Sequence, residues 1–180
     1  MNIIQVNAAA LPIYVEELAS VLIDAITHGA SVGYTSQITR EEATRYFHSL
    51  CPALAEEELL LWIAKDESGV IGTVQLSLCQ KPNGLNRAEV QKLLVHSHAR
   101  RNGIGRKLMK ELEKSALAQS RGLLFLDTQV DSVAEHLYRS LGYQRVGELP
   151  DYAAAPDGSY YPTAIYYKRL FLLSPPFGTA

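Results

Sequence analysis

A glycine-containing loop at positions 100–105, with the sequence RRNGIG, has the residue types and spacing best suited to chemistry. Gly103 and Gly105 stand at the start of an apolar pattern with helical spacing, so several backbone N–H groups can point at one anion, helped by the helix dipole. Glycine also removes the Cβ atoms that would block a phosphate. Arg106 and Lys107 add positive charge beside the two arginines of the loop. The pattern therefore predicts a pyrophosphate site.

Two other interpretations of this loop are weaker. A solvated helix start explains a bare Gly-x-Gly, but the strand before it, the helix after it and four flanking cations favour an anion site. A dinucleotide fingerprint would have a third glycine where Leu108 stands, and the strand before the loop contains Glu89 and Lys92 although a central parallel strand is nearly all apolar. A Walker loop is excluded because Gly-Lys-Ser/Thr is absent.

The elements that must position this loop begin with two predicted helices. Apolar residues at helical spacing over 18–26 predict a helix that stops at Gly29. Thr39 and Glu42 form a capping-box pair for a second helix, which should end before Pro52.

Strand-like runs surround these helices. The first is short, at 3–6, and three more follow at 59–65, 70–78 and 88–95, with a hairpin turn at 66–69. Three antiparallel strands are the simplest interpretation of the middle of the chain. The last of them leads directly into the glycine loop.

The second half of the chain predicts a strand–helix–strand crossover. An amphipathic helix from Ile104 to Ala116 should lie against a sheet, followed by a buried strand at 123–126 and a short helix at 134–141. Two final strands are expected at 143–146 and 165–170. The loop between them should contain Pro150, Pro156, Gly158 and Pro162. The fold class predicted is mixed α/β, with residues 1–180 forming one domain.

Composition narrows the functional classes. Lys and Arg total 17 against 19 Asp and Glu, a net charge of −2 that argues against a general nucleic-acid partner. Cys51 and Cys79 fit a reducing cytoplasm better than a disulfide framework. No apolar run approaches the roughly 20 residues that cross a bilayer, and the N-terminus lacks the pattern of a signal peptide. We expect a cytoplasmic protein without membrane contact.

A metal site is not expected. His96 and His98 alternate after a strand, but no third ligand stands at convincing spacing.

Two motifs resemble those of the GCN5-related N-acetyltransferases. The R-x-x-G-x-G pattern at 100–105, after EVQKLLV at 89–95, resembles the acyl-CoA signature, and A-x-x-L-Y-x-x-L-G-Y at 134–143 resembles the C-terminal motif. Three further segments, at 29–33, 76–93 and 145–150, resemble the tabtoxin resistance acetyltransferases. The resemblance therefore extends over nearly the whole chain.

The resemblance implies the fold of that superfamily, a mostly antiparallel splayed sheet flanked by helices, and acetyl-CoA as the acetyl donor. It further implies a small amine as acceptor, a toxin or antibiotic above all, and is compatible with a homodimer. Asp131 departs from the asparagine of many members and is left out of the predicted site. The predicted acetyl-CoA residues are Leu93, Leu94, Val95, Arg100, Arg101, Asn102, Gly103, Ile104, Gly105 and Arg106.

The resemblance also implies catalytic roles for three side chains. Glu89 and Asp127 are candidate bases, acting directly or through water, and Tyr138 would return a proton to the CoA sulfur. A backbone N–H of Leu94 or a neighbour would bind the thioester oxygen. By position alone, Glu89 also suits a solvent-facing strand residue, Asp127 a helix-capping acid and Tyr138 a core aromatic.

Two other functions stay open. A peptide or protein N-acetyltransferase would need an open groove for an extended chain. A CoA-binding regulator without catalysis would have no reason to keep Glu89, Asp127 and Tyr138 together.

Overall fold

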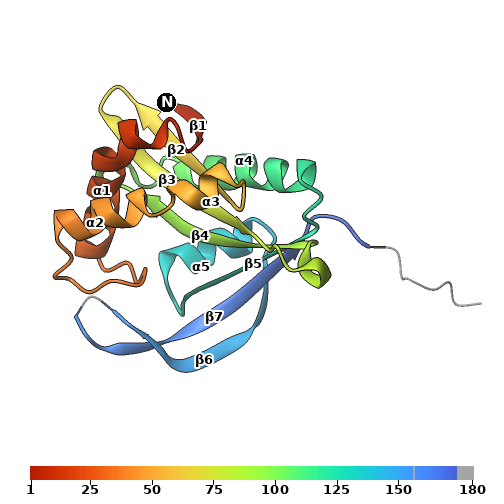
Figure 1. The fold of residues 1–180 in the computed structure, drawn as a ribbon. Helices are drawn as coiled ribbons and strands as arrows, with labels where there is room; N and C mark the ends of the chain where they lie inside the picture. Colours follow the sequence, from red (N-terminus) through yellow and green to blue (C-terminus); the bar gives the residue numbers. More distant parts are fainter. Residues whose placement is uncertain (156, 174–180) are drawn as a thin grey trace, which may run out of the picture.

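The structure is a computed structural model that describes residues 1–155 and 157–173. Over these residues one sheet has the strand order β1-β2-β3-β4-β5-β7-β6 (Figure 1). Its strands are β1 (Asn2–Val6), β2 (Leu59–Asp66), β3 (Gly69–Leu78), β4 (Arg87–Val95), β5 (Leu123–Gln129), β6 (Gln144–Ala154) and β7 (Tyr160–Arg169). The α-helices are α1 (Leu11–Thr27), α2 (Arg40–His48), α3 (Cys51–Ala55), α4 (Ile104–Ala118) and α5 (Val133–Ser140). The predicted mixed α/β class is confirmed.

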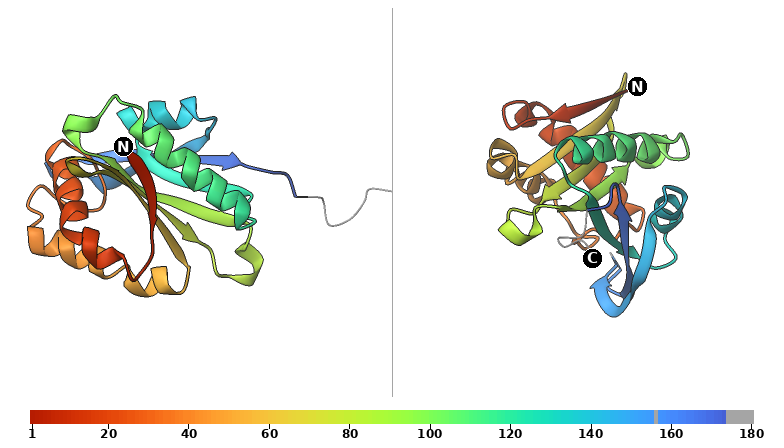
Figure 2. Two further views of the ribbon diagram at one scale, coloured as in Figure 1. Left: turned by 90° about the horizontal axis from the view of Figure 1, so that it is seen from above. Right: turned by 90° about the vertical axis from the view of Figure 1, so that its right-hand side faces the viewer.

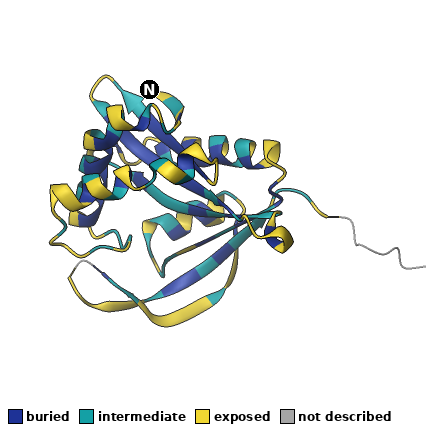
Figure 3. Ribbon diagram, in the orientation of Figure 1, coloured by how far each residue is buried: buried dark blue, intermediate teal, exposed yellow. Residues whose placement is uncertain are grey.

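Helices cover both faces of the sheet, and each face has its own apolar core. Helices α1, α2 and α3 lie on one face, and α4 and α5 lie on the other (Figure 2). Leu18, Leu22 and Phe47 are fully buried on the first face, and Leu108 and Leu112 on the second. Burial is deepest along the central strands (Figure 3). Within the described residues, every helix is too short or too polar to cross a bilayer.

The helix boundaries follow the capping signals. The Thr39 side chain accepts a hydrogen bond from the backbone N–H of Glu42, and the Glu42 carboxylate accepts one from the backbone N–H of Thr39, so the predicted capping box is confirmed. Gly29 has φ +85 just after α1, a conformation that glycine adopts without strain. The second helix ends before Pro52, as predicted. A further helix, α3, has no counterpart in the predicted elements, and Pro52 lies in its first turn, where a missing N–H costs nothing.

The prediction for the last two strands was wrong in length. Both strands are longer than expected, so Pro150 lies in β6 and Pro162 in β7 rather than in a loop. Strand β6 is an edge strand whose register shifts between Leu149 and Ala153, and an irregular edge tolerates a residue without an N–H. Gly158 lies in the turn, whereas Pro156 falls outside the described residues.

A bulge in β4 changes which face its side chains meet. Lys92 has φ +50, and the pairing with β3 shifts register between Thr73 and Gln75. Before the bulge Val90 packs in the core under α4, whereas after it Leu94 packs in the core under α1. An extra residue on one strand reverses the alternation in this way.

Strands β4 and β5 separate soon after they meet. Their parallel pairing joins 87–89 to 123–125, and the ladder between them ends there. Strand β5 continues with β7 as its partner, while β4 continues along β3. The two central strands therefore open a gap at the end of β4 that leads to the glycine loop.

Candidate functional site

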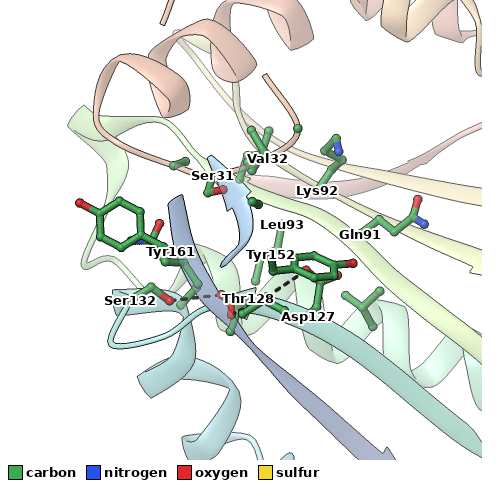
Figure 4. Close-up of a pocket in the computed structure, with 18 of the residues that line it drawn as sticks. Ser31, Val32, Gln91, Lys92, Leu93, Asp127, Thr128, Ser132, Tyr152 and Tyr161 are labelled. Carbon is green, nitrogen blue, oxygen red and sulfur yellow. Dashed lines mark hydrogen bonds between the residues drawn. The ribbon is translucent and has the colours of Figure 1, made fainter. Parts of the chain in front are cut away.

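A cavity of about 480 Å³ lies where β4 and β5 diverge. Its walls come from the loop at 29–33, from β4 at 89–94, from β5 at 127–129, and from α2, α5 and the β6–β7 hairpin. All three predicted catalytic residues line it: Glu89, Asp127 and Tyr138. Figure 4 shows side chains from β4 and β5 facing this shared space.

The two carboxylates enter the cavity from neighbouring strands. Glu89 lies at the last residue of the β4–β5 ladder, and Asp127 lies two residues beyond that ladder on β5. The Thr163 hydroxyl of β7 shares its one proton between Asp127 Oδ2 at 3.2 Å and the Thr128 carbonyl oxygen at 3.0 Å. The site thus has two proton acceptors within one solvent-accessible space.

Tyr138 is a core aromatic and a cavity residue at once. Its side chain is 6% exposed and packs on Tyr143 with ring centroids 5.7 Å apart. Burial, and then the charge of Asp127, raise the pKa of Tyr138 well above its ordinary value. Its hydroxyl therefore keeps its proton at neutral pH and can donate it.

The edge of β4 that faces the gap carries backbone donors. His96 donates its N–H to Ile71 of β3 at 2.9 Å, so alternation along the strand directs the N–H of Leu94 toward β3 as well. The N–H groups of Leu93 and Val95 then face the open side. Leu94 or a neighbour was predicted to supply the backbone N–H that binds the thioester oxygen. The strand geometry favours its neighbours, Leu93 and Val95, for that role.

The glycine loop ends at the first turn of α4, where backbone N–H groups have no partner within the helix. Arg101 and Gly103 have φ of +63 and +73, and a Cβ built on Gly103 would meet nothing within 4 Å. Left-handed residues in such a turn help several N–H groups converge on one anion. The space and the donors both suit a phosphate.

Neighbouring side chains shape this loop. Arg100 Nε donates to Val95 O at 3.1 Å, and Arg106 Nη2 donates to Ser140 Oγ at 2.7 Å. Gly105 has a different role from Gly103, because its Cβ would stand 3.0 Å from Leu137 of α5. The second glycine allows α4 and α5 to pack closely.

The cavity gathers only part of the predicted site. Leu93 and Leu94 line it, whereas Val95 and the residues from Arg100 to Arg106 lie beyond it, along the continuation of β4. Sequence reasoning gave no role to Tyr46 or Lys92, which also line the cavity. The only signal for Lys92 was its charge within a central strand. Among the described residues there is no cluster of three or more metal-binding side chains.

A buried glutamate holds the start of α5 in place. Glu135 is 3% exposed, and its carboxylate accepts hydrogen bonds from the Tyr166 hydroxyl, the Arg139 guanidinium and the backbone N–H of Asp131. Burial opposes ionisation, yet these bonds together hold the pKa of Glu135 below its ordinary value. Asp131 itself has φ +62, so the turn before α5 depends on this support.

We expect Glu135→Ala to lower the free energy of unfolding by about 3 kcal/mol at neutral pH, because it leaves polar groups without their ionic partner. Since the folded pKa of Glu135 is lowered, this loss should be full above the usual glutamate range and shrink as the pH falls through it. Urea denaturation at several pH values measures this loss of unfolding free energy. The control Glu148→Ala removes an exposed ion pair with Arg145 and should cost under about 1 kcal/mol. Equal losses in the two variants would contradict this role.

Comparison with known proteins gives three kinds of match. The model of the acetyltransferase (GNAT) family matches residues 23–143. An N-acetylaspartate synthetase from Danio rerio is 34% identical over 92 residues, which is 51% of this chain and 32% of that protein. The chain therefore spans about a third of the length of this curated relative.

Solved structures share the fold over nearly the whole chain. The protein yncA from Salmonella typhimurium, solved with its cofactor acetyl-CoA, has a TM-score of 0.77 at 16% identity, covering 99% of this chain and 98% of that one. A ribosomal-protein-alanine N-acetyltransferase from Brucella melitensis has a TM-score of 0.75 at 21% identity, covering 94% and 100%. An aminoglycoside 6'-acetyltransferase type Ii has a TM-score of 0.68 at 22% identity, covering 97% and 100%. At these identities the likeness is one of fold.

Proposed function

The chain belongs to the acetyltransferase (GNAT) family, and we propose on this premise that it transfers the acetyl group of acetyl-CoA to the amine of a small molecule, as a toxin- or antibiotic-detoxifying enzyme. The observation that carries the proposal is the cavity between β4 and β5, where Glu89, Asp127 and Tyr138 meet beside an unpaired strand edge. A regulator without catalysis would not need this combination.

Acetyl-CoA, when bound, supplies an activated thioester. The first turn of α4 would hold its pyrophosphate, with Gly103 leaving open space and Arg101 adding charge. The N–H groups of Leu93 and Val95 would bind the pantetheine arm and the thioester oxygen, where fixed donors stabilise the charge that develops. The donor thus lies along β4 and reaches the cavity from the loop side.

The cavity residues would then handle the protons. A primary amine is mostly protonated at neutral pH, so Glu89 or Asp127 accepts its proton, directly or through water, before the nitrogen attacks. Tyr138 would donate a proton to the departing sulfur. Burial keeps the Tyr138 hydroxyl protonated until that step, and it also makes the hydroxyl a weaker acid than an exposed tyrosine.

The shape of the cavity favours a small acceptor. The loop at 29–33 and the β6–β7 hairpin both form part of its wall, and Tyr152 and Tyr161 of the hairpin line it. An extended peptide would need a groove open at both ends. The resemblance of 76–93 to tabtoxin resistance acetyltransferases supports a role in detoxification.

Thermal shift and thiol release test this proposal together. Acetyl-CoA at about 100 times its Kd should stabilise the protein by about 2.7 kcal/mol and raise its Tm by a few degrees, whereas NAD should not. Arg101→Ala should reduce the Tm shift caused by acetyl-CoA, and the control Lys114→Ala, on the exposed side of α4, should not.

The thiol-release assay tests the activity. Acetyl-CoA together with a panel of amines (β-lactam amino acids, aminoglycosides, polyamines and peptides) should release CoA thiol. A Tm shift with NAD alone would overturn the proposal.

A further inference from the structure

Lys92 lies in the cavity at the β4 bulge, and the residues around it hold its amino group in one place. The side chain is half-buried, and Nζ lies 5.5 Å from the ring centroid of Tyr46 on α2. A Cβ built on Gly33 would stand 4.0 Å from the same Nζ. The ammonium group therefore lies between α2 and the loop at 29–33, on the acceptor side of the cavity rather than along the donor loop.

The aromatic wall behind Lys92 is itself fixed. The Tyr46 hydroxyl donates to Oε1 of the fully buried Gln75 at 2.9 Å, and burial raises the pKa of Tyr46 to about 12. Phe47 and Tyr34 pack against the Tyr46 ring edge to face, with centroids 5.0 and 6.0 Å away. A cation held over such a ring is oriented before any ligand arrives.

The charge on Lys92 has no direct ionic partner among the described residues. Glu89 and Asp127 act on it only through their charge, which opposes the effect of burial on the pKa of Lys92. A half-buried ammonium whose nearest carboxylates act only at a distance gains from a ligand that brings an anion into direct contact with it. The cavity thus presents one cation and two carboxylates, arranged for a molecule that carries both an amine and an acid.

We propose that Lys92 is a specificity-determining residue that binds the carboxylate of the acceptor, so that the acceptor is an amino acid or an amino-acid-like molecule. This inference rests on the proposed function, since it names the class of amine. The acceptor's carboxylate lies against Lys92 and Tyr46, and its amine then points toward Glu89 and Asp127. The same ion pair fixes which end of the acceptor meets the thioester.

The test compares amino acids with their neutral amides in the thiol-release assay. The panel holds the common amino acids and β-lactam amino acids, each beside the matching carboxamide, together with polyamines and aminoglycosides. The wild-type enzyme should prefer the acid over its amide in kcat/KM. Lys92→Met should raise KM for the acid about 30-fold or more, erase that preference and leave KM for acetyl-CoA unchanged. Lys92→Arg, which keeps the charge, should retain the preference.

Lys65→Met is the matched control, because Lys65 also lies over a tyrosine ring, with Nζ 5.2 Å from the Tyr14 centroid, but on β2 outside the cavity. Its kinetics should equal those of the wild type. A best acceptor without an acidic group, or an acid preference that survives in Lys92→Met, would overturn the role of Lys92 while acetyl transfer stands. No thiol release with any amine, in a protein that binds acetyl-CoA, would contradict the proposed function and the inference together.

Discussion

Replacing Tyr138 with phenylalanine should lower kcat about 100-fold while the protein keeps its fold and its affinity for acetyl-CoA. General-acid catalysis contributes about 10²- to 10⁴-fold, and the variant removes only the hydroxyl that would supply the proton. The ring would still pack on Tyr143 and within the core under α4. Steady-state thiol release gives kcat, and thermal denaturation checks the fold.

Tyr143→Phe is the matched control for this loss. The Tyr143 hydroxyl is buried, faces Glu113 and lies outside the cavity, so its removal tests the loss of a buried hydroxyl that has no role in proton donation to the sulfur. We expect a kcat within about twofold of the wild type. A Tyr138→Phe enzyme with wild-type kcat across the pH range would remove Tyr138 from the mechanism, and equal losses in both variants would point to packing instead.

The fold was largely predictable because its local signals agree. Apolar spacing in α1 and α4, the capping box at Thr39 and the turn between β2 and β3 each indicate one element, and the structure has them all. The final strands were harder, since their prolines indicate loops. Pro150 is tolerated only because β6 is an irregular edge strand, and edge position is a property of the sheet, not of the segment.

The candidate site was predictable only as far as its motifs reach. Glu89, Asp127 and Tyr138 were named from the resemblance, and their shared cavity follows from the crossover that makes β4 and β5 neighbours. The bulge at Lys92 could not be predicted, because a lysine with φ +50 has no sequence signal comparable to glycine. The contact between Lys92 and Tyr46 joins residues far apart in the chain and depends on that bulge.

Neutralising both carboxylates should have the second large effect. Glu89→Gln and Asp127→Asn should each lower kcat/KM at neutral pH by about 10- to 100-fold, and the double variant by about 1,000-fold. Both changes keep the shape of the side chain, and Asp127→Asn can still accept the hydrogen bond from Thr163. Glu111→Gln, on the exposed face of α4, is the control and should not alter the rate.

The pH dependence of the double variant distinguishes a base from a binding charge. Without a carboxylate to take the proton, only amine molecules that are already neutral in solution can react, so kcat/KM should rise about tenfold per pH unit until the amine is deprotonated. The wild type should rise less steeply over the same range. If the carboxylates only attracted a cationic acceptor, the variant would instead show a raised KM with an unchanged pH profile. If the double variant had the kcat/KM of the wild type at every pH, the carboxylates would act neither as a base nor as a binding charge.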